Sequence, residues 1–443
     1  MSSFRHRLLM TIALTSLAAG RPGAQLLPAL PAGGLGNVGR ALGALPPAVG
    51  APLSQLLAPA ERQTAIAPSL DRVAVPDAVA SLTADSLLEL RRLRLHELVS
   101  THSRELDLDE RGNPVRRGVL VAADPDPQAL AAAAAAGFRT VGIDRNEALG
   151  LTTVTLSIPD NLKARDALKR VHRAAPGLEA DYDHVYEPSG GSLAAVGGAL
   201  AIGGSGSGPA VAMIDGGVAA HPSLAGASIE QRAFAGSAKA TGHGTAVASL
   251  LVGSQGPFHG AAQGARLYVA DVYGGSPAAG SASAIVRALG WAASKHPDVI
   301  SISLVGPGNR LLERAVQLLA ARGVPLVAAV GNDGPAAPVQ YPAAYPGVLA
   351  VTAVDGHDRA LPEAGRAAKL DYAAPGADMA AALPGSGYAR VRGTSFATPL
   401  VAARIAEAGM QRLPGEALPG RGKVGRGIVC RSCRIDPRLV GAK

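Results

Sequence analysis

Four polar residues lie in short, glycine-containing segments and carry the side chains that hydrolysis of an amide bond requires. They are a carboxylate, an imidazole, a hydroxyl and a carboxamide: Asp215, His243, Ser395 and Asn332. A serine that attacks an amide needs a base to take its proton, a carboxylate to orient that base, and hydrogen-bond donors for the oxyanion that develops. The four residues provide one candidate for each of these tasks.

Asp215 and Asn332 each follow an apolar run that is typical of a buried strand. Asp215 ends the run 211–215 and precedes two glycines, and Asn332 follows the run 328–330 after one glycine. A buried carboxylate at a strand end can be aimed at a neighbouring group, and an amide there can donate to an oxyanion. Taken singly, each residue is also explained as part of an ordinary turn, because Asp and Asn are common turn residues.

His243 and Ser395 each lie where a helix is expected to begin. Glycines flank His243 on both sides and allow close approach of the backbone, and small residues follow it. Ser395 begins a helix, and the free N–H groups and positive dipole end of a helix N-terminus favour a negative oxygen. Taken singly, His243 is better explained as a surface or structural histidine, and Ser395 as an ordinary helix cap.

From residue 210 onward, apolar strands alternate with helices. The expected strands end at Asp215, Asp271, Ser303 and Val330. The expected helices cover residues 243–252, 283–294, 311–321 and 395–408. This alternation predicts an α/β fold with a parallel sheet covered on both faces. Functional residues in such sheets gather at the carboxyl ends of the strands, where two of the four candidates stand.

A different pattern precedes this region. Four runs of β-forming residues are separated by two helical runs, in the order 119–122, 127–136 (helix), 138–143, 152–158, 161–173 (helix) and 181–186. The order βαββαβ is that of a split-βαβ, ferredoxin-like domain. Ahead of it, Ser86 and Glu89 form a capping box that predicts the start of an amphipathic helix.

The four motifs together resemble those of the subtilisin-like serine peptidases, the subtilase family. The order Asp, His, Ser is that of subtilisin, with separations of 243 − 215 = 28 and 395 − 243 = 152 residues. Further matches cover most of residues 205–430. The resemblance implies that Asp215 orients His243, that His243 is the general base and then the acid, and that Ser395 is the nucleophile. It also implies an oxyanion hole formed by Asn332 and the backbone amide of Ser395.

The resemblance extends to substrate binding and to maturation. In this family an extended peptide adds a strand between two edges of the enzyme. The matching segments here are 275–280 and the residues Ser303, Leu304, Val305 and Gly306. Val305 stands where the family commonly has glycine, which predicts a narrow cleft and a preference for small residues before the cut. The ferredoxin-like domain resembles the family's propeptide, which templates folding and whose tail occupies the cleft until self-cleavage.

Several departures from the family pattern bear on cofactors. Gly216 replaces the hydroxyl residue usual after the aspartate, and Ala246 replaces a frequent second histidine, but neither change removes a reacting group. The loop 253–260 is short and poor in acidic residues, whereas calcium needs six or more oxygen ligands. We therefore expect no metal and no cofactor.

Composition and the two termini bound the partners and the compartment. The 443-residue chain has a net charge of +8, without a long basic run interleaved with aromatics, so nucleic acid is not the expected partner. The expected partners are polypeptide substrates and the chain's own prodomain, without a stable membrane partner. Basic residues at 5–7 before the apolar run 8–19 indicate a secretory signal, with an uncleaved anchor as the alternative. A secreted or periplasmic protein is expected to join Cys430 and Cys433 in a local disulfide.

The expected organisation has seven segments. In chain order they are a signal peptide (1–24), a flexible Pro/Ala/Gly-rich region (25–84), an amphipathic helical segment (85–114), a propeptide-like domain (115–188), a Gly/Ser-rich processing linker (189–209), a catalytic domain (210–433) and a tail (434–443). The predicted function is a secreted serine endopeptidase made as a self-processing zymogen. The alternative is a non-catalytic binding scaffold that its uncleaved prodomain keeps plugged.

Overall fold

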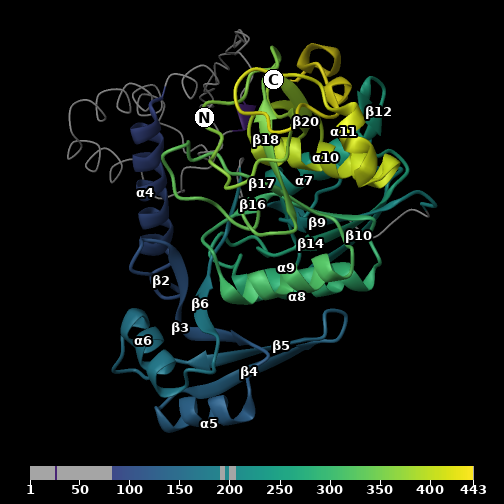
Figure 1. Ribbon diagram of the computed structural model, residues 1–443. Coiled ribbons are helices and arrows are strands. Elements are labelled where there is room, and N and C mark those ends of the chain that lie inside the picture. Colours follow the sequence, from purple (N-terminus) through teal and green to yellow (C-terminus); the bar gives the residue numbers. More distant parts are fainter. Residues whose placement is uncertain (1–24, 27–81, 190–194, 199–205, 443) are drawn as a thin grey trace, which may run out of the picture.

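The computed structural model describes residues 25–26, 82–189, 195–198 and 206–442 (Figure 1). The predicted signal peptide, most of the Pro/Ala/Gly-rich region and part of the processing linker lie outside the described residues. We call residues 206–442 the large unit, residues 106–184 the small unit, and residues 185–189 the tail. No described helix is long and apolar enough to cross a membrane.

A parallel sheet of seven strands forms the centre of the large unit. The strands, in spatial order, are β10 (Ser228–Ala233), β14 (Arg266–Asp271), β9 (Ala210–Asp215), β15 (Val299–Ile302), β17 (Leu326–Ala329), β18 (Val348–Val354) and β19 (Tyr372–Pro375). The central strands are continuous apolar runs because both of their faces are buried, as in β9, where every residue is buried. The predicted α/β fold with a parallel sheet is confirmed.

Helices cover both faces of this sheet. They are α7 (Gly242–Val252), α8 (Ala282–Ser294), α9 (Arg310–Ala321) and α10 (Thr394–Ala408). Each begins one residue before its predicted start. α7 and α10 share one hydrophobic core, and α8 and α9 share the core on the opposite face, which is the face toward the small unit (Figure 1).

Shorter elements complete the large unit. They are the hairpins β12 (Ser254–Gln255) with β13 (Phe258–His259) and β20 (Met379–Ala382) with β21 (Tyr388–Val391), the strands β11 (Lys239–Thr241) and β16 (Leu304–Val305), and the helix α11 (Leu413–Glu416). Two strands from upstream segments add to these edges: β1 (Gln25–Leu26) pairs with β21, and β8 (Ala195–Gly198) pairs with β11.

The small unit is a sheet with two helices on one face. Its elements are β2 (Leu106–Leu108), β3 (Pro114–Ala123), α5 (Pro127–Ala135), β4 (Arg139–Asn146), β5 (Leu151–Ser157), α6 (Ala164–Ala174) and β6 (Ala180–His184). β3 lies between β5 and β6, and β4 pairs with the far side of β5, as in a split-βαβ fold. Along β3, alternate residues face different cores. Leu120 and Ala122 pack among α5 and α6, whereas Val121 and Ala123 belong to the core of α8 and α9.

The helix α4 (Ala84–Thr101) precedes the small unit and begins earlier than predicted. Its cap is Thr83, whose hydroxyl accepts a hydrogen bond from the Ser86 backbone N–H at 3.2 Å. The prediction that Ser86 and Glu89 start the helix is therefore wrong. Ser86 is already in the first turn, and Glu89 pairs with Arg92 instead. Thr83, three positions upstream of Ser86, is also a suitable cap residue, and the helix begins there instead.

The C-terminal segment packs onto the large unit. Cys430 and Cys433 form the predicted disulfide. Beyond it, the Ala380 N–H donates to the Ile435 carbonyl at 2.9 Å, and the Ile435 side chain is buried in the core of α7 and α10.

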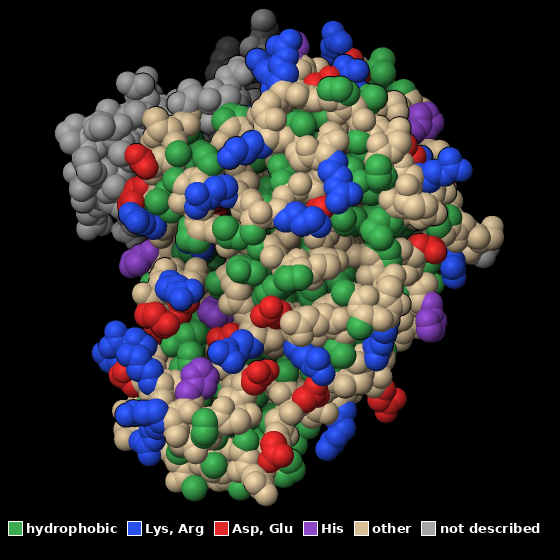
Figure 2. Space-filling model, in the orientation of Figure 1, with side chains coloured by type: hydrophobic (Ala, Val, Ile, Leu, Met, Phe, Trp, Pro, Cys, Tyr) green, Lys and Arg blue, Asp and Glu red, His purple; other side chains and the backbone are tan. Residues whose placement is uncertain are grey.

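Charged side chains of both signs are interspersed over the face of the molecule shown in Figure 2. On this face no continuous basic stripe is visible. The distribution agrees with the interpretation of the net positive charge as scattered surface residues.

Gly244 permits the contact between α7 and the turn after β9, which leads to a test. A Cβ atom at Gly244 would lie 2.3 Å from the Gly216 carbonyl oxygen and 2.6 Å from that of Gly217. Alanine normally favours a helix over glycine. Here we expect Gly244→Ala to destabilise the fold by about 1–3 kcal/mol, because backbone atoms cannot give way cheaply. Thermal unfolding in a Ser395→Ala background, which removes the predicted nucleophile, measures the effect.

Gly226→Ala is the matched control, because a Cβ there meets no atom within 4 Å. This variant should unfold within a degree or two of the parent protein. A melting temperature of Gly244→Ala at or above that of the parent would contradict the close approach.

Candidate active site

Asp215 and His243 are brought together by the end of β9 and the start of α7. His243 Nδ1 lies 2.8 Å from Asp215 Oδ1, and both side chains are buried. The same carboxylate oxygen accepts the Gly216 N–H at 2.6 Å. Thr241 caps α7 by accepting the Gly244 N–H at 3.0 Å, which fixes the turn that carries the imidazole. The carboxylate therefore holds one ring nitrogen and leaves the other directed elsewhere.

The other ring nitrogen and the Ser395 hydroxyl remain available for chemistry. His243 Nε2 and Ser395 Oγ are both buried, and neither has a hydrogen-bond partner among the described residues. The histidine ring packs against Phe396, the residue after Ser395, with ring centroids 5.4 Å apart. The structure thus joins Asp215 to His243 by a hydrogen bond, and the contact between His243 and the α10 segment is made by Phe396, the residue after Ser395.

Two donors from different elements converge on one carbonyl oxygen. The Asn332 side-chain amide and the Ser395 backbone N–H, the latter at 3.4 Å, both donate to the carbonyl oxygen of Ser189. Asn332 is itself oriented, because its Oδ1 accepts the Thr394 N–H at 3.0 Å. Preorganised donors on a carbonyl oxygen are the arrangement that stabilises an oxyanion.

The tail that carries Ser189 lies between two edges of the large unit as an added strand. Its strand β7 (Glu187–Pro188) pairs antiparallel with β16, and the Ser189 N–H donates to the Ser303 carbonyl at 3.0 Å. On the other side, the Tyr186 N–H donates to the Gly280 carbonyl at 2.8 Å. These are the two segments that the sequence predicts as the walls of the cleft.

The predicted cleft residues occupy distinct places along this strand. Leu304 and Val305 form β16, and Gly306 faces the Tyr186 ring so closely that a Cβ there would lie 2.5 Å from it. The Ser303 hydroxyl donates to the Ser395 carbonyl at 3.0 Å and so links the cleft wall to the start of α10.

Tyr186 anchors the tail in a buried pocket. Its hydroxyl donates to the Pro307 carbonyl at 2.8 Å, and the Tyr273 hydroxyl donates to the Tyr186 carbonyl at 3.1 Å. Burial raises the pKa of Tyr186 well above its ordinary value. The phenol therefore stays neutral and keeps its donor role at any physiological pH.

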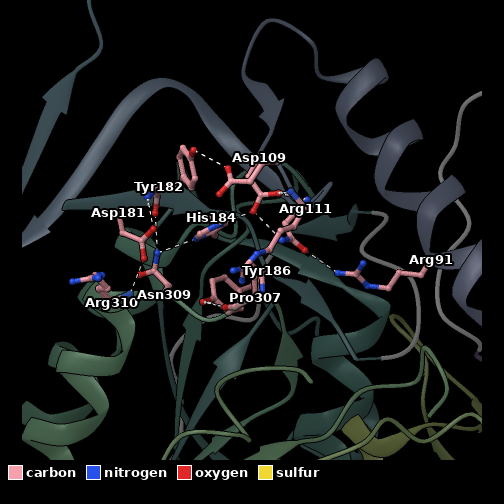
Figure 3. Close-up of polar contacts among 12 residues, drawn as sticks. Arg91, Asp109, Arg111, Asp181, Tyr182, His184, Tyr186, Pro307, Asn309 and Arg310 are labelled. Atoms are coloured by element: carbon pink, nitrogen blue, oxygen red, sulfur yellow. Dashed lines mark hydrogen bonds and ion pairs between the residues drawn. The ribbon is translucent and has the colours of Figure 1, made fainter. Parts of the chain in front are cut away.

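The small unit is held against the N-termini of α8 and α9 by carboxylates of β6. Figure 3 shows Asp181 beside Asn309 and Arg310, where Asp181 accepts the Arg310 N–H at 2.9 Å. Asp183 accepts the Ser283 N–H at 2.9 Å at the start of α8. Carboxylates at helix N-termini satisfy free N–H groups and match the positive end of the dipole.

Asn309 joins the same two units through its side-chain amide. The amide donates to the Tyr182 carbonyl at 2.8 Å and lies 3.1 Å from His184 Nδ1 (Figure 3). The contacts of β6 thus fix where the tail leaves the small unit and enters the cleft.

Sequence reasoning missed two residues of this site. Thr394 Oγ1 accepts the Gly331 N–H at 3.2 Å and lies 2.8 Å from Ser189 Oγ. Thr394 therefore connects the loop that carries Asn332 to the tail. The sequence predicts Ser189 only as the first residue of the processing linker. The position of Thr394 directly before Ser395 is a signal that could have indicated its role, but no sequence pattern marks Ser189.

Asp271 is a further buried carboxylate beside the site, on the strand next to Asp215. It accepts the backbone N–H groups of Lys239, Tyr273 and Gly274, each at 2.9 Å. Burial raises the pKa of Asp271, and these three hydrogen bonds oppose that rise. The side chain thereby fixes the start of β11 and the turn after β14. Among the described residues, no group of three His, Cys, Asp or Glu side chains is placed to hold a metal ion.

A buried ion pair supports the start of α10. Arg392 Nε lies 2.6 Å from Glu363 Oε1, and Arg392 Nη2 donates to Glu363 Oε2 at 2.9 Å. The Glu363 carbonyl accepts the Gly334 N–H at 2.9 Å. One residue therefore contacts both the segment before Ser395 and the loop that carries Asn332.

Comparisons with known proteins find relatives of the large unit. A model of the Subtilase family matches residues 206–415. Subtilisin Savinase of Lederbergia lenta is 39% identical over 204 residues, which cover 45% of this chain and 75% of that protein. The alkaline protease of Alkalihalobacillus alcalophilus is also 39% identical over 204 residues, and these cover 53% of its length.

A solved structure extends the fold comparison. Fervidolysin from Fervidobacterium pennivorans, a keratinolytic enzyme related to subtilisin, is 19% identical with a TM-score of 0.58. The match covers 73% of this chain and 61% of that structure. At this identity the likeness concerns the fold alone.

The Glu363–Arg392 pair gives a second test. Glu363→Ala leaves a buried guanidinium without its partner, and we expect a loss of about 3–5 kcal/mol in unfolding free energy. Glu416→Ala is the control, because the Arg404–Glu416 pair is about 30% exposed on each side. That variant should lose at most about 1 kcal/mol. Urea unfolding in the Ser395→Ala background compares them, and equal losses would contradict a structural role for the buried pair.

Proposed function

This chain belongs to the subtilase family and is a serine endopeptidase, and we propose that it is made as a zymogen that cuts its own chain. Its substrates are polypeptides, which it hydrolyses through an acyl-enzyme. The observation that carries the proposal is the Ser189 carbonyl oxygen, which accepts hydrogen bonds from both Asn332 and the Ser395 amide. A carbonyl held in this way is polarised for attack by a nearby hydroxyl.

We assign the catalytic roles to Asp215, His243 and Ser395. His243 Nε2 removes the Ser395 proton as Oγ attacks the carbonyl carbon, and the Asp215 carboxylate keeps the ring in the required tautomer and stabilises its cation. The oxyanion forms between the Asn332 amide and the Ser395 N–H. The imidazolium then protonates the leaving amine, and water hydrolyses the ester by the reverse sequence of proton transfers. The buried 2.8 Å contact of His243 with Asp215 supports this assignment.

We propose that self-cleavage occurs at the bond between Ser189 and Gly190, and the same contacts support this site. The tail enters the cleft in the direction and extended form of a substrate, and Ser189 is the residue whose carbonyl meets the donors. After the cut, the small unit and tail still fill the cleft, so the small unit acts as an intramolecular inhibitor until it leaves. This proposal narrows the predicted processing linker 189–209 to its first bond.

We also propose that the enzyme works outside the cytoplasm, as a secreted or periplasmic protein. Basic residues followed by a short apolar run at the N-terminus support export. The Cys430–Cys433 disulfide supports an oxidising compartment.

The competing function is a scaffold that the uncut tail keeps closed. Both proposed functions have a filled cleft, so only the chemical reactivity of Ser395 distinguishes the enzyme from the scaffold. The complete set of a held imidazole, a buried hydroxyl and two donors favours the enzyme, because a scaffold has no need of it.

A fluorophosphonate probe tests the proposed function. We expect the processed protein, once it is freed of the small unit and tail, to be labelled at one serine, because an activated hydroxyl attacks the phosphorus as it would a carbonyl. Ser395→Ala should abolish the labelling, whereas Ser301→Ala, which removes another buried serine hydroxyl, on β15, should keep a labelled site. Wild-type protein that is freed of its tail by an added protease and still stays unlabelled would support the scaffold.

The width of the cleft gives a further test. Val305 is buried on the strand that pairs with the tail, and its Cγ1 would lie 3.7 Å from a Cβ at Gly331, so its branched side chain lies beside the loop that carries Asn332. We expect peptides with Ala or Ser as the residue directly before the cut to be cleaved at least about tenfold faster than peptides with Phe there. Val305→Gly should raise cleavage after Phe. Equal cleavage after Phe and Ala by the unmodified enzyme would contradict a narrow cleft.

A further inference from the structure

The helix α4 lies along the side of the large unit (Figure 1). Its side chains contact the loop that follows Asn332. Leu87 packs on Gly334, where a Cβ would come within 2.8 Å of its Cδ1. Two arginines one turn apart then meet the carboxylate of Asp333. Arg91 Nε lies 3.3 Å from Asp333 Oδ2, and Arg94 Nη2 donates to Asp333 Oδ1 at 2.9 Å.

Arg94 also binds the tail in the cleft. Its Nε and Nη2 donate to the two carboxylate oxygens of Glu187 at 3.1 and 3.2 Å. One guanidinium therefore lies between a carboxylate of the tail and a carboxylate of the large unit. Burial disfavours the cation, but the charges of Asp333 and Glu187 outweigh it and hold the pKa of Arg94 above its ordinary value.

The position of Glu187 in the cleft is fixed by backbone pairing. Glu187 pairs with Val305, and it stands two residues before Ser189, the residue before the proposed cut. In the tail, this side chain is connected to Asp333 through Arg94. In a bound polypeptide, the side chain at the same position would be directed toward Asp333. The Glu187 side chain is 18% exposed and the Asp333 side chain is 7% exposed, so water screens their charges only in part.

The large unit supplies no cation of its own to Asp333. Among the described residues, the ion-pair partners of Asp333 are Arg91 and Arg94, and both belong to α4. When α4 leaves together with the small unit, Asp333 loses both cations and faces the cleft as an uncompensated carboxylate. An acidic side chain at the Glu187 position then meets a like charge, and a basic one meets an opposite charge.

We propose that Asp333 makes the processed enzyme select polypeptides with lysine or arginine two residues before the residue at the cut. Arg94 is the substitute for that basic side chain in the zymogen, and it allows an acidic residue of the chain's own tail to occupy the same position. Asp333 is a specificity-determining residue, and α4 masks it until maturation. The inference rests on the proposed function, because it concerns the substrate of the same site.

Peptides that copy the tail test the inference on the processed enzyme. Three fluorogenic substrates have the sequence Val-Tyr-X-Pro-Ser-Gly, with X as Lys, Gln or Glu. We expect kcat/KM to fall in the order Lys, Gln, Glu, with Lys about five- to tenfold above Glu at low salt. High salt should reduce the ratio because it screens partly exposed charges. Asp333→Asn should bring the three values together, mainly through faster cleavage of the Glu peptide.

Asp436→Asn is the matched control, because it removes one carboxylate from an exposed C-terminal position that pairs with Arg438. It should leave the order of the three peptides unchanged. Cleavage of the Glu peptide as fast as the Lys peptide, or an unchanged order in Asp333→Asn, would overturn the inference alone. Failure to cleave any of the three, together with failure of Ser395 to react with the fluorophosphonate, would overturn the proposed function and this inference with it.

Discussion

The hydrogen bonds to the Ser189 carbonyl oxygen are the constraint on which the candidate site depends. They require the Asn332 loop after β17, the first turn of α10 and the end of the tail to meet at one atom. A parallel sheet makes this possible because its strands end at a common edge, where Asp215 and Asn332 both stand. α7 and α10 share one face and bring His243 and Ser395 to the same edge.

The tail reaches this point because each part of the small unit is fixed in turn. The C-terminal half of β3 is buried on both faces, with one set of residues in the core of the small unit and the alternate set against α8 and α9. Asp181 and Asp183 of β6 bind the N-termini of α9 and α8, and Tyr186 fills a pocket beside Gly306. The docking of the small unit, the pocket for Tyr186 and the pairing of β7 with β16 together set the register of the tail in the cleft. As a result, the carbonyl of Ser189, and not that of a neighbouring residue, accepts the two hydrogen bonds.

Local sequence patterns predicted much of this architecture. Helix starts were predicted within one residue for α7 to α10, because capping residues and small-residue runs are local signals. The disulfide and the alternation of strands and helices were also readable from spacing. The strands β10, β18 and β19 were not assigned. β10 is an edge strand with mostly polar residues, and β18 and β19 are short apolar runs that carry none of the four candidate residues. Thr83, and not Ser86, caps α4.

The features that sequence could not provide are the contacts between distant segments. Arg94 and Asp333 are 239 positions apart, and Ser189 and Asn332 are 143 apart. No periodicity links such residues, and their pairing follows only from the docking of the small unit. The register of the tail is likewise a tertiary property, because the glycine-rich segment after it offers many equivalent bonds.

The position of the self-cleavage site tests the central claim most directly. Intact-mass analysis of the purified protein, together with sequencing of the new N-terminus, locates the cut to a single bond. The account predicts a large fragment that begins at Gly190 and a companion fragment that ends at Ser189, both absent in Ser395→Ala. A large fragment that begins elsewhere in the segment 190–209, or the same fragments from the Ser395→Ala protein, would contradict it.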